Sequence, residues 1–305
     1  MSKMTRFTSL CKEITENILD SLDLVELSSL ATMTSTLHTN IDEYIQRCRR
    51  IIFARFISNI QEFVGLLQGT GAVVSGSCAL NLVQARQGAV AINDLDIYTT
   101  LQNFKDFVQF FTETEHYTVI RNINHPPPGP YNSSGMAKLF RLQNNGRNVD
   151  IIVTNLSSAI SPIFQFHSTI VMNFISAEAV FCAYPGWTLD MAGLVHPRMY
   201  KQNATNFATV KGLAKYMQRG FTVYLEITEL AVHESRCVKM YYCPQITRST
   251  NDKGKLAWVA GHKETATGAL GSANYIDTKA VIWSLGGDQC YNERVSGSPS
   301  FVFAT

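Results

Sequence analysis

Three aspartates lie inside apolar segments whose composition predicts buried β-strands. Asp94 and Asp96 flank a single leucine in the stretch at 92–98, and Asp150 lies in the stretch at 148–153. Successive side chains of a strand point to opposite faces, so Asp94 and Asp96 share one face and their apolar neighbours share the other. Carboxylates in such strands are unfavourable unless a cation compensates them. The chain must therefore fold around a charged site on one face of its sheet.

The strand that carries Asp150 is expected to be half of a hairpin. Residues 136–142 and 148–154 flank an Asn-Gly pair at 145–146, which is a typical two-residue hairpin turn. In the second of these segments Val149, Ile151 and Val153 share the core face, so Asp150 lies on the opposite face. Two separate strands thus present carboxylates on the side that their hydrophobic residues avoid.

Length and composition exclude several classes of protein. The chain has 305 residues, 46% of them hydrophobic, which suffices for two or three compact units. A net charge of +2 does not indicate a nucleic-acid partner, although it leaves one open. The seven cysteines are scattered, and there is neither an apolar leader nor an apolar run long enough to cross a membrane. We expect an intracellular protein of the cytoplasm or nucleus with reduced thiols.

The first part of the chain predicts helices followed by alternating strands and helices. Residues 8–50 show helical spacing, and Asp23 with Glu26 forms a capping-box pattern. A helix is expected over 56–67, a strand over 72–74, a helix over 78–85, a strand over 94–98 and a helix around 104–111. The proline-rich stretch at 126–130 predicts a stiff surface loop.

The second part of the chain predicts one amphipathic helix and then mostly strands. Residues 205–218 form the helix, ended by a glycine, and Lys211 and Lys215 share one of its faces. Its apolar stripe consists of Val210, Leu213, Ala214 and Met217. The expected fold class is α+β: a helical segment over 1–55, a mixed sheet flanked by helices over 56–220, and a β-rich region over 221–305, in which Trp258 and Trp283 fill the core.

The chain resembles the nucleotidyltransferase superfamily, which includes polymerase β and the minimal nucleotidyltransferases. The resemblance lies in a motif of Gly76-Ser77, then Asp94-Leu95-Asp96, then Asp150 on a later strand. The resemblance covers roughly residues 56–220. Sixteen residues separate Ser77 from Asp94, more than most members have, so an extra turn or loop is expected there.

The resemblance implies Mg²⁺-dependent (or Mn²⁺-dependent) transfer of a nucleoside monophosphate from a nucleoside triphosphate to an acceptor hydroxyl. Asp94 and Asp96 would hold the metal ions, and Asp150 would complete the second metal site and orient or deprotonate the hydroxyl. Hard oxygen ligands suit Mg²⁺, and a pair of such ions stabilises attacking and leaving oxygens together. Gly76 and Ser77 would admit the triphosphate at a helix N-terminus.

Two lysines and one histidine have both a functional and a structural interpretation. Lys211 and Lys215, with Arg219 one turn further on, would bind the triphosphate or nucleic acid, or else form a solvated face. His167 suits an interior position better than a catalytic one. His233, Cys237 and Cys243 lack the paired Cys-x-x-Cys spacing of a typical zinc site.

The N-terminal helices resemble an F-box, the module that docks adaptor proteins onto cullin-type ubiquitin ligases. The matching residues are 10–14, 18–19 and 22–24, with Cys11 where the family usually has proline. A helical bundle that packs on the rest of the chain explains the same pattern. The stretches at 166–169 and 216–221 are similar to fungal proteins that join an F-box-like start to a nucleotidyltransferase fold. The alternative function is therefore a ubiquitin-ligase adaptor with a catalytically inactive body.

Overall fold

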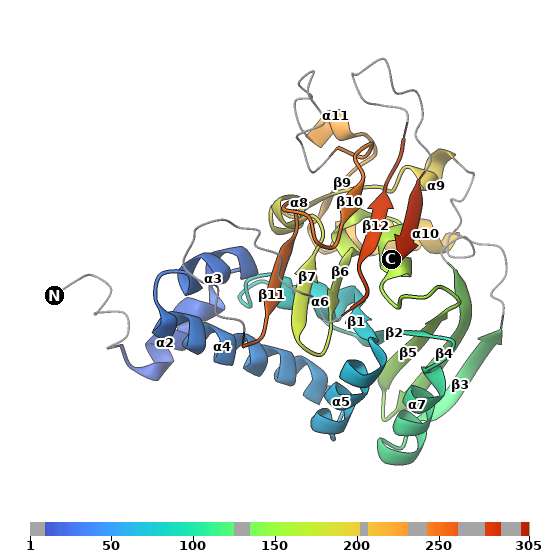
Figure 1. Cartoon of the computed structure of the whole chain (residues 1–305), viewed down its shortest axis with the longest axis horizontal. Coiled ribbons are helices and arrows are strands. Elements are labelled where there is room, and N and C mark those ends of the chain that lie inside the picture. The colour runs from blue at the N-terminus through green and yellow to red at the C-terminus, as the bar shows by residue number, and fades with distance from the viewer. Residues whose placement is uncertain are drawn as a thin grey trace.

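A computed structural model of the chain describes residues 10–124, 135–201, 207–230, 243–261, 278–287 and 300–304. Within these residues, eight strands form one mixed sheet in the order β11-β7-β6-β1-β2-β5-β4-β3 (Figure 1). The strands are β1 (Val73–Ser75), β2 (Asp94–Thr100), β3 (Thr118–Asn124), β4 (Met136–Asn144), β5 (Arg147–Thr154), β6 (Asn173–Ile175), β7 (Ala179–Cys182) and β11 (Leu256–Val259). The expected loop at 126–130 lies outside the described residues.

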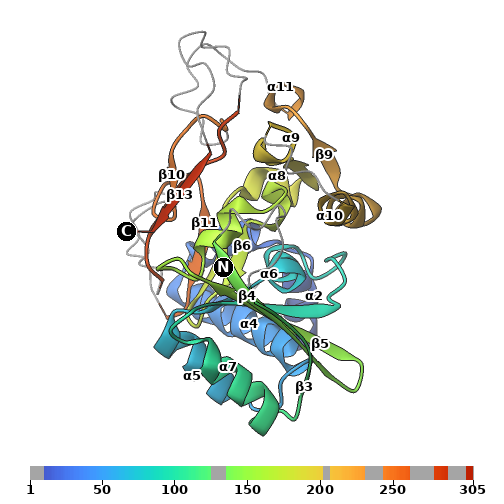
Figure 2. The ribbon, with the colours of Figure 1, turned by 90° about the vertical axis from the view of Figure 1, so that its right-hand side faces the viewer.

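Helices surround this sheet. In chain order they are α2 (Lys12–Asp20), α3 (Leu24–Ala31), α4 (Ser35–Ala54), α5 (Ile60–Thr70), α6 (Gly76–Val83), α7 (Phe104–Gln109), the π-helical η1 (Phe110–Thr114), the 3-10 turns η3 (Ser161–Gln165) and η4 (Thr169–Val171), α8 (Pro185–Leu189), α9 (Arg198–Lys201), α10 (Phe207–Gln218) and α11 (Ile227–Leu230). Figure 2 shows α4, α5 and α7 on one side of the sheet and α10 on the other.

The local sequence explains where the N-terminal helices begin. Asp23 accepts hydrogen bonds from the backbone of α3 while Glu26 bonds back to Asp23, so the predicted capping box is confirmed. Thr34 caps α4, and Asn59 caps α5. The helix expected over 56–67 therefore begins four residues later, at its cap, and ends at Gly71 in the left-handed conformation.

The strands around the aspartates pair in both directions. β1 is antiparallel to β2, and β2 is parallel to β5. The predicted hairpin joins β4 to β5, with Asn144 opposite Arg147 and with positive φ angles at both Asn145 and Gly146. β3 was not expected from the sequence, because most of its residues are exposed and polar at the sheet edge.

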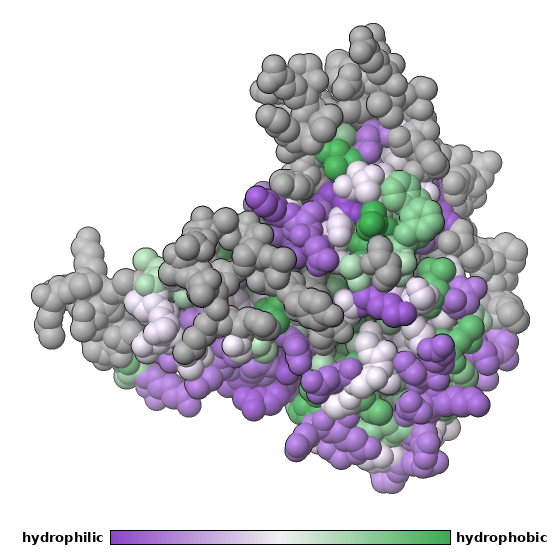
Figure 3. Space-filling view, in the orientation of Figure 1, coloured by the Kyte–Doolittle hydropathy of each residue, from purple (hydrophilic) through white to green (hydrophobic). Residues whose placement is uncertain are grey.

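Two hydrophobic cores lie on the two faces of the sheet. The first joins Leu95, Ile97 and Val149 to the apolar faces of α3, α4, α5 and α7. The second joins Tyr98 and Ile152 to α8, to the end of α10 and to the C-terminal strands. Hydrophilic residues gather over the outer surface near α4 and α5 (Figure 3). The N-terminal helices thus pack on the body, as the bundle interpretation expects; their F-box character stays a prediction.

The C-terminal part is β-rich, as expected, but it is divided between sheets. β11 joins the edge of the large sheet, whereas β10 (Arg248–Ser249), β12 (Val281–Ser284) and β13 (Phe301–Ala304) form a sheet of their own. Trp283 is fully buried in the second core. Trp258 instead packs in the first core, where its ring stacks on His38 and its indole N–H donates to Asp42.

The apolar stripe expected on α10 is confirmed only in part. Leu213 and Ala214 are partly buried, but Val210 and Met217 are exposed to 51% and 58%. Gly212 and Tyr216 also contact the body. Glycine permits a close approach that a larger residue would prevent. In the described part of the chain, no helix is both long and apolar enough to span a lipid bilayer.

Candidate functional site

The three aspartates converge on one face of the sheet. Asp96 lies directly opposite Asp150 in the parallel β2–β5 pair, and Asp94 is two residues earlier on the same face of β2. Neighbouring strands are about 4.8 Å apart, so the carboxylates of Asp96 and Asp150 are within reach of one another. This face is the one that Tyr98 and Ile152 share, opposite the core packed by Leu95 and Ile97. The predicted alternation of faces is confirmed.

The turn between β1 and α6 brings backbone against these carboxylates. Ser75 pairs with Asp96 across β1 and β2, and Gly76 follows with a φ of +65°. A Cβ at Gly76 would collide with Oδ2 of Asp96 and would lie 3.2 Å from its Cγ. The Ser77 hydroxyl lies 3.4 Å from Oδ1 of Asp94. Glycine is required here both for the backbone angle and for the close approach.

The N-terminus of α6 has no side-chain cap. Its N-cap residue, Ser75, donates its hydroxyl to the carbonyl of Asn173 at 2.6 Å and so does not bond to the first turn of the helix. The first N–H groups of a helix lack intrahelical partners and attract anions, phosphate in particular. An uncapped helix N-terminus therefore lies beside the carboxylate cluster.

This arrangement makes ionisation of Asp96 unfavourable. Burial, with the nearby charges of Asp94 and Asp150, raises its pKa well above the usual carboxyl range. Lys215 and Arg141 act in the opposite direction, but they do not cancel the rise. The ionised form of Asp96 is therefore unfavourable in the protein alone, and a further cation bound beside it would stabilise that form.

Asp150 has a partner that the sequence analysis does not predict. Nε and Nη2 of Arg141 donate to its two carboxylate oxygens, at 2.8 and 2.5 Å. These hydrogen bonds also raise the pKa of Arg141. The hairpin could have revealed the pair: a two-residue turn at 145–146 sets Asn144 opposite Arg147, and the same register sets Arg141 opposite Asp150.

The two lysines that we expected to bind the nucleotide differ in position. Lys215 lies close enough for its charge to lower the pKa of Asp96 and that of His167. Lys211 is exposed on α10. His167 packs beneath Gly212, and burial, with a smaller effect of Lys215, lowers its pKa to about 4, so it is neutral at pH 7. The interior position predicted for His167 is confirmed.

The long spacer between Ser77 and Asp94 forms a loop after α6. The side chain of Asn81 donates to the carbonyl of Val90 at 2.7 Å, and the backbone of Val90 donates to Gln84 at 3.1 Å. The backbone of Gln87 in turn donates to the carbonyl of Asp20 on α2. These bonds close the extra residues against α2 and α6 and leave β2 in register with β1.

The cluster fits a metal ion that arrives with a phosphate ligand. Mg²⁺ is commonly held by one or two carboxylates together with waters and substrate phosphates. Asp94 and Asp96, next to the uncapped helix end, supply that donor set. Among the described residues, no group of three or more His, Cys, Asp or Glu side chains is arranged to hold a metal. Because Arg141 occupies both oxygens of Asp150, the third carboxylate is directed toward a protein cation instead.

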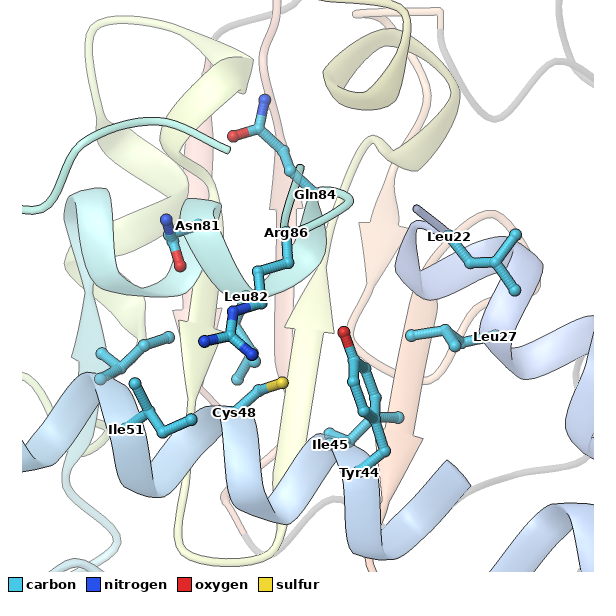
Figure 4. A pocket seen from close by; sticks show the side chains of 11 residues that line it. Leu22, Leu27, Tyr44, Ile45, Cys48, Ile51, Asn81, Leu82, Gln84 and Arg86 are labelled. Atoms are coloured by element: carbon cyan, nitrogen blue, oxygen red, sulfur yellow. The ribbon is translucent and has the colours of Figure 1, made fainter. Parts of the chain in front are cut away.

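A separate pocket between α4 and α6 is too small for a nucleotide. Its volume is about 60 Å³, enough for a few water molecules. Its polar side chains, which lie among aliphatic neighbours, come from Tyr44, Cys48, Asn81, Gln84 and Arg86 (Figure 4). The hydroxyl of Tyr44 donates to Asp20 at 2.7 Å, so this polar edge is already satisfied. The pocket helps to join the N-terminal helices to the body.

Comparing Gly76→Ala with Gly71→Ala should separate the steric effect of the contact with Asp96 from the effect of backbone strain. A non-glycine residue at a left-handed φ costs about 1–2 kcal/mol. Gly71 has the same φ of +65° with open space around its Cβ position, so Gly71→Ala should lose only this amount. Gly76→Ala should lose more, because Asp96 must also move. Urea unfolding of both variants measures the difference, and equal losses would contradict the geometry of the turn.

Asp96→Asn should stabilise the protein at neutral pH. Because the folded-state pKa of Asp96 lies above its unfolded value, the free energy of unfolding falls as the pH rises through that interval. Asn cannot ionise, so in a chelator the variant should be more stable than wild type at pH 7, and the gain should vanish near about pH 3. The exposed Asp106→Asn is the control and should show little change. If Asp96→Asn were less stable than wild type at pH 7, the claim that ionised Asp96 destabilises the folded protein would be contradicted.

Comparisons of the chain with protein-family models, with curated proteins and with solved structures found no match. The case for a function therefore depends on the arrangement of Gly76, Ser77 and the three aspartates, and on the cations that approach them.

Proposed function

We propose that the protein binds a Mg²⁺–nucleoside triphosphate complex at the Gly76–Ser77 turn and transfers a nucleoside monophosphate to an acceptor hydroxyl. The observation that carries this proposal is the environment of the Asp96 carboxylate. This carboxylate is crowded by Asp94 and Asp150, touches the turn at Gly76, and lies beside a helix end without a cap. A cation with bound phosphates satisfies all three features at once.

The pattern of strands agrees with the resemblance found in the sequence. The motif requires Gly-Ser at a strand-to-helix turn, two acids flanking one apolar residue, and a third acid on a distant strand. β1 leads into α6 through Gly76, β2 carries Asp94 and Asp96, and β5 sets Asp150 directly opposite Asp96. These points support a nucleotidyltransferase-like body over roughly 56–220.

The residues have distinct roles in the proposed reaction. Ser77 and the N–H groups of α6 bind phosphate oxygens, and Lys215 adds positive charge on the side of α10. The acceptor oxygen bonds to the α-phosphorus, the bond from that phosphorus to the β-phosphate oxygen breaks, and pyrophosphate leaves. Asp150 faces the acceptor and takes the hydroxyl proton when Arg141 releases one of its oxygens. When bound, Mg²⁺ supplies charge neutralisation at the phosphates.

Transfer of label from an α-³²P-labelled nucleotide tests the proposal directly. Wild-type protein should label an acceptor in the presence of Mg²⁺ or Mn²⁺, and a chelator should stop the reaction. Asp94→Asn and Asp96→Asn should each reduce the rate at least about a hundredfold, because each removes a metal ligand. Asp106→Asn, an exposed carboxylate on α7, should retain the wild-type rate.

The enzyme proposal fails if wild-type protein transfers label from none of the four nucleotides and also fails to bind any of them with Mg²⁺. A direct binding measurement accompanies the transfer assay for this reason. Binding without transfer points to a missing acceptor, whereas absence of both removes the proposed site.

A ubiquitin-ligase adaptor function is the second candidate, and one observation favours it. Leu10 and Ile14, two residues of the F-box resemblance, are exposed to 37% and 48%. The apolar faces of α3 and α4 are buried against the body, so docking would have to use this outer surface of α2. The small adaptor protein of the ligase should then co-purify with wild type but not with Ile14→Asp. Met33→Asp, at a site 59% exposed, is the control and should still co-purify; equal capture of both variants would exclude docking at α2.

A further inference from the structure

A row of four charged residues crosses the sheet beside the candidate site. Asp96 on β2 is opposite Asp150 on β5, which is opposite Arg141 on β4, which is opposite Arg121 on β3. Directly opposed residues of neighbouring strands have their side chains on the same face. With strands about 4.8 Å apart, Arg141 lies about 5 Å and Arg121 about 10 Å from Asp150, on the side away from Asp96.

A β-bulge puts Arg121 into this row. Val119 pairs with Leu142, and the register then shifts so that Arg121 pairs with Arg141. Without the shift Ile120 would face Arg141, and Arg121 would face Phe140 on the side of the first core. Bulges frequently re-aim a side chain next to a functional site. Here the bulge leaves Ile120 52% exposed and moves a guanidinium to the face of the aspartates.

The resulting pair of arginines is unfavourable by itself. Like charges directly opposite in an antiparallel pair destabilise it. Arg141 has Asp150 as its partner, and its side chain is still 43% exposed. Arg121 is exposed and makes no ion pair with any residue in the described part of the chain. An anion between the two guanidiniums would relieve the repulsion, and the fork of Arg donors matches phosphate oxygens.

We propose that Arg121 and Arg141 form a subsite for a phosphate group of the acceptor molecule. The acceptor is then a phosphate ester with a free hydroxyl about 5–10 Å from the phosphate, the span that the strands set between Asp150 and the two arginines. This inference rests on the proposed function, because Asp150 is assigned there to the acceptor hydroxyl. The triphosphate of the nucleotide lies at the other end of the row, at Gly76 and Asp96.

Binding of small phosphate compounds to the whole chain tests the subsite without any catalysis. Isothermal titration calorimetry measures the affinity for inorganic phosphate and for glycerol 3-phosphate. A chelator in the buffer removes any metal-dependent contribution to this binding. Arg121→Gln should weaken the binding of both compounds at least about tenfold. Arg121→Lys should retain part of the lost affinity, because it keeps the positive charge. Arg50→Gln removes an exposed arginine on α4 and should bind as wild type does. Arg121 is exposed at a sheet edge, so its variants should fold.

Three results would overturn the subsite. The first is that wild type shows no saturable phosphate binding, and the second is that Arg50→Gln and Arg121→Gln weaken phosphate binding equally. The third is that Ser77→Ala loses phosphate binding while Arg121→Gln retains it, which would locate the phosphate at the helix end. A parallel titration with a non-hydrolysable nucleoside triphosphate and Mg²⁺ separates the two proposals. Nucleotide binding without phosphate binding overturns the subsite alone. Arg121-dependent phosphate binding without nucleotide binding overturns the proposed function and leaves an anion site.

A short oligonucleotide distinguishes the source of the phosphate. If it binds more tightly than glycerol 3-phosphate, with the same dependence on Arg121 and a steep dependence on salt, the acceptor is a polynucleotide end. If glycerol 3-phosphate binds at least as tightly, the acceptor is a small phosphate ester. Either result supports the subsite, provided that Arg121→Gln weakens the binding.

Discussion

The partial burial of three carboxylates on one face of a sheet, together with their mutual repulsion, is the constraint on which the rest of the site depends. Asp96 is only partly accessible to water, because Gly76 and the turn into α6 lie against it. Its neighbours therefore determine what the site can bind. An uncapped helix end on one side and a lysine from α10 on the other both favour an anion that carries its own cation.

A second ion pair in the same molecule shows what a purely structural arrangement looks like. Arg248 is 1% exposed, and it donates to both carboxylate oxygens of Asp252 and to the carbonyl of Ala183. Its guanidinium also lies 4.9 Å from the centre of the Tyr184 ring. Here each charge has a partner. Of Asp94, Asp96 and Asp150, only Asp150 is paired with an arginine, so two carboxylates without an arginine partner remain on the face that we assign to substrate.

Much of the site could be predicted from residues close in sequence. The alternation of Asp94-Leu95-Asp96 fixed their face, and the Asn145-Gly146 turn fixed the register that sets Arg141 against Asp150. Long-range features could not be predicted in this way. The bulge before Arg121 depends on packing at the sheet edge, and the approach of Lys215 depends on how α10 docks through Gly212. Trp258 belongs to the first core because β11 crosses to the far edge of the large sheet, which no local pattern indicates.

A crystal structure of the full chain with a non-hydrolysable nucleoside triphosphate and Mg²⁺ tests the central claim most directly. The account predicts a metal ion bound by Asp94 and Asp96, with the triphosphate over Gly76 and Ser77 at the N-terminus of α6. A structure at saturating nucleotide in which the three aspartates bind neither metal nor phosphate, or in which the nucleotide lies away from α6, would contradict it.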